Sequence, residues 1–119
     1  MASRKIEDLT PELQTLYHKF EAGMIEAGID FIVTCTYRSQ EEQDKLFARG
    51  RTSPGKKVTW TRRSRHTERT AFDIAVIKGG EISWNEKDYD KPGRIGEKAG
   101  LEWGGAWKSP DRPHFQLKG

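Results

Sequence analysis

The strongest constraint on the fold is an apolar alternation over residues 71–77, AFDIAVI, with one carboxylate inside it. Successive side chains of a β-strand point to opposite faces, so Phe72, Ile74 and Val76 share one face. Asp73 then lies on the other face, with an alanine on either side. An ionised carboxylate on such an apolar strand is costly unless a cation or hydrogen-bond donors meet it. The stretch therefore predicts a core strand with a polar centre on its second face.

The rest of the chain alternates between helical and extended patterns. Its 119 residues suffice for one domain with a modest core. Thr10 and Pro11 predict a helix start, and Gly28 its end. Ser39 opens a capping box that predicts a second helix through Phe47. The further expectations are a strand at 31–37, a hairpin turn at 78–81, a weaker helix at 88–99 and a strand at 114–117.

The composition and the N-terminal residues limit the classes to which the protein can belong. A formal net charge of +3 and a pI near 9.1 would favour an anionic partner such as nucleic acid, membrane or acidic wall polymer, although a solvated surface accounts for most of these charges. The first residues hold no apolar signal sequence, and no apolar run reaches transmembrane length. We expect synthesis in the cytoplasm without a signal peptide and no stable membrane insertion. The single Cys35 is expected to be a small buried core residue.

His66, Asp73 and His114 are two imidazoles and a carboxylate, a donor set that zinc accepts while keeping a fourth position open. Asp111 is set off from the His114 strand by Pro113, which favours an extended step. That placement would let Asp111 take a proton from an activated water and pass it to a leaving amine. By spacing alone the pattern is weak, because a histidine near an apolar strand is more often a structural residue.

Two basic features leave alternatives open. Arg38 falls between a strand end and a helix start, where it would bind an anion or form a salt bridge with a neighbouring acid. Residues 49–65 are rich in Gly, Pro, Lys and Arg around Trp60. This loop would form either an active-site rim or a nucleic-acid-binding surface.

Several motifs, in order, resemble the zinc peptidases that include VanY-type D,D-carboxypeptidases and phage L-alanyl-D-glutamate endopeptidases. Ser64, His66 and Asp73, with Ala71 before the aspartate, resemble the signature S-x-H-x-x-G-x-A-x-D. The spacing D-x-x-H at 111–114 resembles a second signature. Three further stretches are similar to the family, the last two most of all to its phage endolysin branch: Thr36-Tyr37-Arg38-Ser39 with Glu42-Gln43, residues 100–105, and residues 113–116.

The resemblance implies a role for each matching residue. His66, Asp73 and His114 would bind one zinc ion. Asp111 would be the general base. Arg38 would bind substrate or the developing oxyanion. The remaining two implied contacts are Gln43, near the substrate, and Ser64, supporting the histidine loop.

One position departs from the pattern, because Arg69 stands where the family usually has glycine. A glycine there would permit a positive φ, which arginine adopts only at a cost. We therefore expect the turn between His66 and Asp73 to differ in shape, or Arg69 to reach the substrate.

The resemblance implies an α+β domain of the hedgehog/D,D-peptidase type spanning residues 1–119, without a separate wall-binding domain. Its small antiparallel sheet would carry helices on one face and zinc on the other. The expected function is cleavage of the L-Ala–D-Glu bond in peptidoglycan stem peptides by a monomeric phage lysin, released to the periplasmic wall by a holin. Nucleic acid is not an expected partner. Three alternatives stay open: a zinc D,D-carboxypeptidase, a non-catalytic wall-binding module, and a nucleic-acid-binding protein.

Overall fold

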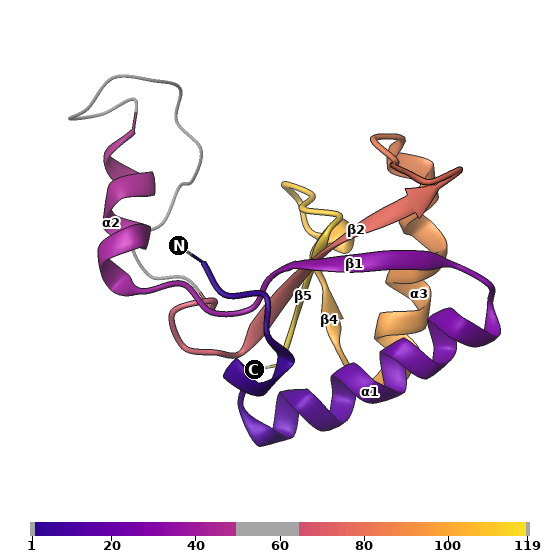
Figure 1. Ribbon diagram of the computed structural model, residues 1–119, viewed down its shortest axis with the longest axis horizontal. Helices are drawn as coiled ribbons and strands as arrows, with labels where there is room; N and C mark the ends of the chain where they lie inside the picture. The colour runs from indigo at the N-terminus through magenta and orange to yellow at the C-terminus, as the bar shows by residue number, and fades with distance from the viewer. Residues whose placement is uncertain (1, 50–64, 119) are drawn as a thin grey trace.

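A computed structural model describes residues 2–49 and 65–118 (Figure 1). The sheet runs in the order β1-β2-β5-β4, with β3 paired to the far end of β2, and each of these strand pairs is antiparallel. The strands are β1 (Asp30–Cys35), β2 (Ala71–Lys78), β3 (Glu81–Ile82), β4 (Glu102–Trp103) and β5 (His114–Gln116). The α-helices are α1 (Pro11–Glu26), α2 (Gln40–Ala48) and α3 (Asp90–Ala99), with short 3-10 helices η1 (Ile6–Asp8), η2 (Glu86–Tyr89) and η3 (Gly104–Ala106).

The core lies between one face of the sheet and the layer formed by α1 and α3 (Figure 1). Phe20 of α1 packs against Phe72 of β2 and Phe115 of β5, with ring centroids 5.6 and 4.8 Å away. All three rings are fully buried. The predicted α+β class, with an antiparallel sheet and helices on one face, is confirmed. The predicted inward face of β2 is confirmed too, because Phe72, Ile74 and Val76 all belong to this core.

Local sequence signals set the element ends. The Thr10 hydroxyl accepts a hydrogen bond from the backbone N–H of Leu13 at 3.3 Å, and Pro11 begins α1, as predicted. The Ser39 hydroxyl caps α2 in the same way, accepting from the N–H of Glu42 at 3.1 Å. The hairpin between β2 and β3 turns at Gly79 and Gly80, whose φ values of 61° and 79° suit a tight two-residue turn.

Helix α3 packs closely on the sheet because glycines face it. A Cβ added to Gly96 would lie 2.4 Å from the ring of Phe115, and one added to Gly93 would lie 2.3 Å from the indole of Trp103. These approaches hold β4 and β5 against the helix. They therefore fix the position of His114, which precedes Phe115 in β5.

Helix α2 stands apart from this helical layer, beyond the end of β1 (Figure 1). The segment that carries Arg38 connects the end of β1 at Cys35 to the start of α2. Among the described residues, no helix has the length and apolar character needed to cross a membrane.

Candidate metal centre

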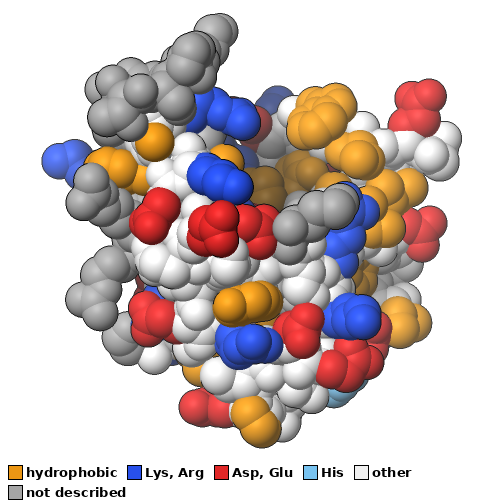
Figure 2. Space-filling view, turned by 60° about the vertical axis from the view of Figure 1, so that its left-hand side comes forward, with side chains coloured by type: hydrophobic (Ala, Val, Ile, Leu, Met, Phe, Trp, Pro, Cys, Tyr) orange, Lys and Arg blue, Asp and Glu red, His pale blue; other side chains and the backbone are white. Residues whose placement is uncertain are grey.

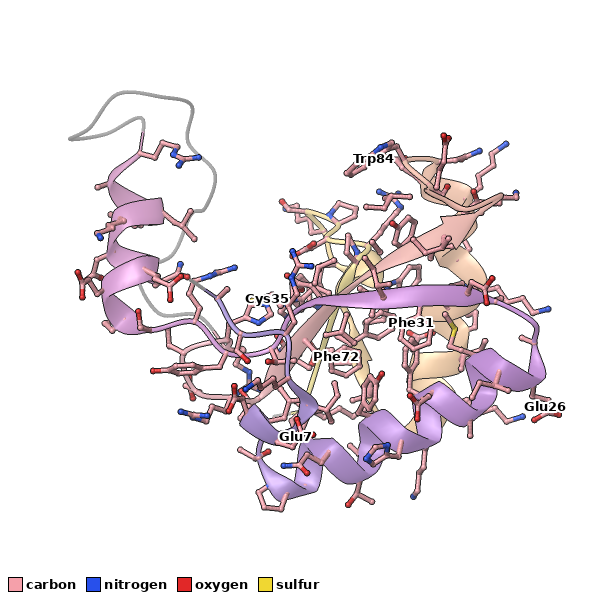
Figure 3. All side chains as sticks on the ribbon, in the orientation of Figure 1. Glu7, Glu26, Phe31, Cys35, Phe72 and Trp84 are labelled. Atoms are coloured by element: carbon pink, nitrogen blue, oxygen red, sulfur yellow. The ribbon has the colours of Figure 1, made fainter. Side chains whose placement is uncertain are left out.

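Three neighbouring strands place polar side chains in one row across the sheet. Cys35 of β1 pairs with Asp73 of β2, and Asp73 pairs with His114 of β5. Directly paired residues on neighbouring strands have their side chains on the same face. The row lies on the face away from the core cluster, and Figure 3 labels Cys35 at its β1 end.

A β-bulge brings Cys35 into this row. The register passes from Val33 opposite Ile74 to Cys35 opposite Asp73, so Thr34 is the extra residue. Without the bulge, Cys35 would face the core with Val33, which packs against the core cluster. The expectation of a buried Cys35 is confirmed, although the residue lies outside the main core cluster. The thiol lies beside the polar centre instead.

His66 comes from the turn before β2 and completes the centre. Its Nε2 lies 3.2 Å from one carboxylate oxygen of Asp73, and Nδ1 of His114 lies 3.0 Å from the other. The two imidazole rings are 5.2 Å apart and nearly perpendicular. The structure thus brings the predicted zinc set together, with one histidine at each oxygen of the Asp73 carboxylate.

Each histidine is anchored through its other ring nitrogen. Nδ1 of His66 lies 3.4 Å from the carbonyl oxygen of Thr36. Nε2 of His114 lies 2.8 Å from Oε1 of Gln116, which the strand pattern places on the same face. A hydrogen bond to an oxygen acceptor holds the proton on that nitrogen, which leaves the other nitrogen free to bind a metal.

The anchor of His114 continues into a side-chain network that the sequence did not reveal. Nε2 of Gln116 donates to a carboxylate oxygen of Glu102 at 3.3 Å, and the indole N–H of Trp107 donates to the same oxygen at 2.9 Å. Glu102 therefore fixes the amide orientation of Gln116, so that Oε1 faces His114. The Trp107 ring also lies 5.3 Å from the imidazole. The network holds His114 in one rotamer, with Nε2 facing an oxygen acceptor.

The electrostatics of the centre keep Asp73 ionised. Burial would raise the pKa of Asp73, but hydrogen bonds from His114 and His66 hold that pKa well below its usual value. Burial alone would lower the pKa of His66, whereas hydrogen bonding to Asp73 and then Cys35 raises it to about 10. The ionised Asp73 carboxylate thus stabilises a positive charge next to it. The proton on His66 provides this charge here, and a bound metal ion would provide it instead.

Cys35, His66 and Asp73 offer ligand atoms that all lie within 4.8 Å of one another, close enough to hold one metal ion. With His114 on the second oxygen of Asp73, the available donors are two imidazoles, a carboxylate and a thiol. This set suits zinc, which binds nitrogen, sulfur and oxygen ligands. The residues present therefore fit a zinc ion.

Asp111 lies at the edge of the centre. Its carboxylate is 4.0 Å from Nδ1 of His114. Burial, and after it the charge of Asp73, raises the pKa of the Asp111 carboxyl. The Asp111 backbone is fixed by Gly104, whose carbonyl accepts its N–H at 2.9 Å and where an added Cβ would lie 2.4 Å from the Asp111 carbonyl oxygen. The Asp111 carboxylate, which is more basic than that of an ordinary aspartate, is therefore held at the edge of the centre.

Arg38 approaches from the other side. Its guanidinium donates to Oε1 of Gln43 at 2.7 Å and lies 3.8 Å from the Cys35 sulfur. Gln43 is fully buried, so its amide holds the guanidinium in place from the interior. Within residues 2–49 and 65–118 no ion pair joins Arg38 to a carboxylate, and its binding of an anion stays a prediction. The predicted contribution of Ser64 lies outside the described residues.

Arg69 adopts the conformation expected of the glycine that it replaces, with φ of 62°. Arginine thus takes the positive φ that the sequence associates with glycine. The guanidinium lies 4.0 Å from the ring centroid of Tyr37 and donates to the carbonyl of Asp8 at 3.0 Å. These contacts offset the backbone strain and direct the side chain away from Asp73.

Replacing Arg69 by alanine is expected to lower the free energy of unfolding by about 1–2 kcal/mol, because the strain stays while the cation–π contact and hydrogen bond are lost. Arg69→Gly should cost less, since glycine relieves about 1 kcal/mol of left-handed strain. Urea denaturation of both variants tests this order. Equal stability of the alanine variant and the parent chain would show that the Tyr37 and Asp8 contacts contribute nothing.

Comparison with known proteins identifies the family. A model of the M15 peptidases, described as D-alanyl-D-alanine carboxypeptidase, matches residues 57–117. The peptidoglycan L-alanyl-D-glutamate endopeptidase CwlK of Bacillus subtilis is 36% identical over 123 residues, which cover 92% of this chain and 74% of CwlK. The chain belongs to the M15 peptidase family. The expectations of an enzyme and of a metallopeptidase are therefore confirmed.

A solved structure extends this M15 assignment to the whole fold. The L-Ala D-Glu endopeptidase ChiX of Serratia marcescens superposes with a TM-score of 0.76 at 26% identity, covering 99% of this chain and 89% of ChiX. The matched region of the family model contains His66, Asp73, Asp111 and His114. It does not extend to Arg38 or Gln43.

The surface of the M15 domain around α2 carries both signs of charge. Figure 2 shows Lys and Arg side chains interspersed with Asp and Glu, and Lys45 of α2 pairs with Glu41 at 3.5 Å. Residues 50–64, on which the rim and nucleic-acid hypotheses depend, lie outside the described residues.

Proposed function

We propose that the protein is a zinc-dependent peptidoglycan hydrolase that cleaves the stem peptide between L-alanine and D-glutamate. The observation that carries the proposal is the convergence of His66 and His114 on the two oxygens of Asp73, with Asp111 at 4.0 Å from His114. The bond is suggested by two relatives whose names specify this endopeptidase activity.

His66, Asp73 and His114 would hold the zinc ion, each through the atom that now faces the centre. When bound, zinc would polarise the scissile carbonyl and make water a better nucleophile at neutral pH. Asp111 would accept a proton from the attacking water and deliver it to the leaving amine, because its carboxylate lies at the edge of the centre, 4.0 Å from His114. Arg38, positioned by Gln43, pairs with the developing negative charge or with a substrate carboxylate.

Incubation with purified muropeptides and mass analysis of the products tests the bond assignment. We expect release of the peptide beginning at D-glutamate, with L-alanine left on the glycan, and loss of this activity after chelation. Restoration by added zinc should follow. Loss of a terminal D-alanine alone would instead establish the D,D-carboxypeptidase activity named by the family description.

We also propose that the enzyme serves a phage lysis system and acts on the periplasmic wall after holin release. The support is the similarity of residues 100–105 and 113–116 to phage endolysins.

A further inference from the structure

A cavity of about 240 Å³ opens beside Asp111, and the zinc mechanism does not use it. One wall is the segment from Ser83 to Tyr89 and the other is the segment from Pro110 to Pro113. Asp111 lines the cavity and also lies 4.0 Å from His114. Asp111 therefore belongs both to the lining of this cavity and to the edge of the metal centre.

Trp84 stands at the edge of this cavity with 85% of its surface exposed (Figure 3). The indoles of Trp103 and Trp107 are packed and donate hydrogen bonds to Arg112 and Glu102. Trp84 packs into no core cluster of the described residues. A large aromatic ring kept in water beside a cavity offers a flat surface on which a ligand can stack.

The segment that carries Trp84 is rigid. The Tyr89 hydroxyl donates to the carbonyl of Ser83 at 3.1 Å and accepts from the N–H of Val76 at 3.2 Å, which ties the segment to β2. The Asn85 side chain accepts from the N–H of Lys87 at 3.0 Å. Trp84 is thus flanked on both sides by fixed residues, so little ordering entropy is lost when its ring is covered.

The opposite wall is fixed as well and combines the prolines Pro110 and Pro113 with the charged residues Asp111 and Arg112. The carbonyl of Arg112 accepts the indole N–H of Trp103 at 2.8 Å. The Arg112 guanidinium lies 3.5 Å from the carboxylate of Glu86, so a cation and an anion compensate each other across the cavity. Carboxylate and guanidinium groups opposite an aromatic ring offer hydrogen-bond acceptors and donors to a ligand with many hydroxyl and amide groups.

We propose that Trp84 and this cavity form a subsite for an amino-sugar ring of the peptidoglycan glycan strand. The inference rests on the proposed function. The L-alanine of the stem peptide is attached to the glycan through a lactyl ether, so a sugar lies one residue from the scissile bond. The C–H face of a pyranose ring stacks on the Trp84 indole, and its hydroxyl and amide groups reach the charged side chains of Asp111 and Arg112.

The test compares two substrates in the zinc-loaded enzyme: a disaccharide-tetrapeptide muropeptide and the same tetrapeptide without sugar. We expect the parent chain to prefer the muropeptide in kcat/KM. Trp84→Ala should reduce this preference by roughly tenfold, the scale of uncovering one aromatic face. Trp84→Phe should recover part of the preference, because it keeps a smaller stacking surface.

Ile25→Ala is the matched control. Ile25 is 72% exposed on α1, outside the core cluster and outside the lining of this cavity, so its truncation should leave the preference unchanged. An equal loss on both substrates in Trp84→Ala, or no loss on either, would overturn the sugar subsite. Failure of the parent chain to cleave either substrate would overturn the proposed function instead.

Discussion

Replacing His66 by alanine should lower kcat/KM for stem-peptide cleavage by more than about 10³-fold, equivalent to roughly 4 kcal/mol of transition-state stabilisation. The reason is that the variant keeps only part of the donor set around Asp73. Bound zinc should fall in parallel, because the lost imidazole is the one anchored by the Thr36 carbonyl for metal binding. Metal analysis and muropeptide digestion on the same sample measure both effects.

Comparing the variants Cys35→Ala and His114→Ala tests whether the thiol or the second imidazole is the third zinc ligand. Both side chains lie in the row through Asp73, and Cys35 forms the compact group with His66 and Asp73. We expect Cys35→Ala to keep zinc and activity, and His114→Ala to lose both. The reverse result would assign the third ligand to the thiol. Full lytic activity of His66→Ala would show that the zinc mechanism itself is wrong.

Asp111→Asn should lower kcat by about 10²–10⁴-fold while zinc content stays unchanged, because the amide cannot carry the proton. The pH profile provides a second readout. Burial, followed by the charge of Asp73, raises the pKa of Asp111, so the basic carboxylate forms only at a higher pH than for an ordinary aspartate. Activity of the parent chain should therefore rise with pH through that pKa, and the asparagine variant should lack this dependence.

Glu97→Gln is the control for Asp111→Asn, since it makes the same carboxylate-to-amide change on α3, where Glu97 pairs only with Arg94 at 3.2 Å among the described residues. Its activity and pH profile should match the parent chain. An Asp111→Asn variant with unchanged kcat would show that another group moves the proton. Loss of zinc from that variant would place Asp111 among the ligands.

The elements that were predicted correctly have local causes. Thr10 and Ser39 cap helices through side chains three residues from their partners, and alternation along β2 assigns Phe72 to the core and Asp73 to the opposite face. The resemblance of short motifs to the family signatures was enough to propose His66 and His114 as zinc ligands, because each motif lies in or next to a single strand and its spacing is local. These features need no knowledge of distant contacts.

The remaining features depend on contacts between residues that are far apart along the chain. Cys35 faces the centre because of a bulge whose register depends on pairing with β2. Arg69 keeps a positive φ because Tyr37 and Asp8, distant in sequence, hold its guanidinium. Glu102 orients Gln116 across two strands, and Trp84 meets the Asp111 segment through the fold alone. Alternation and local motifs carry no information about such pairings, which depend on the register of the sheet and the packing of its loops.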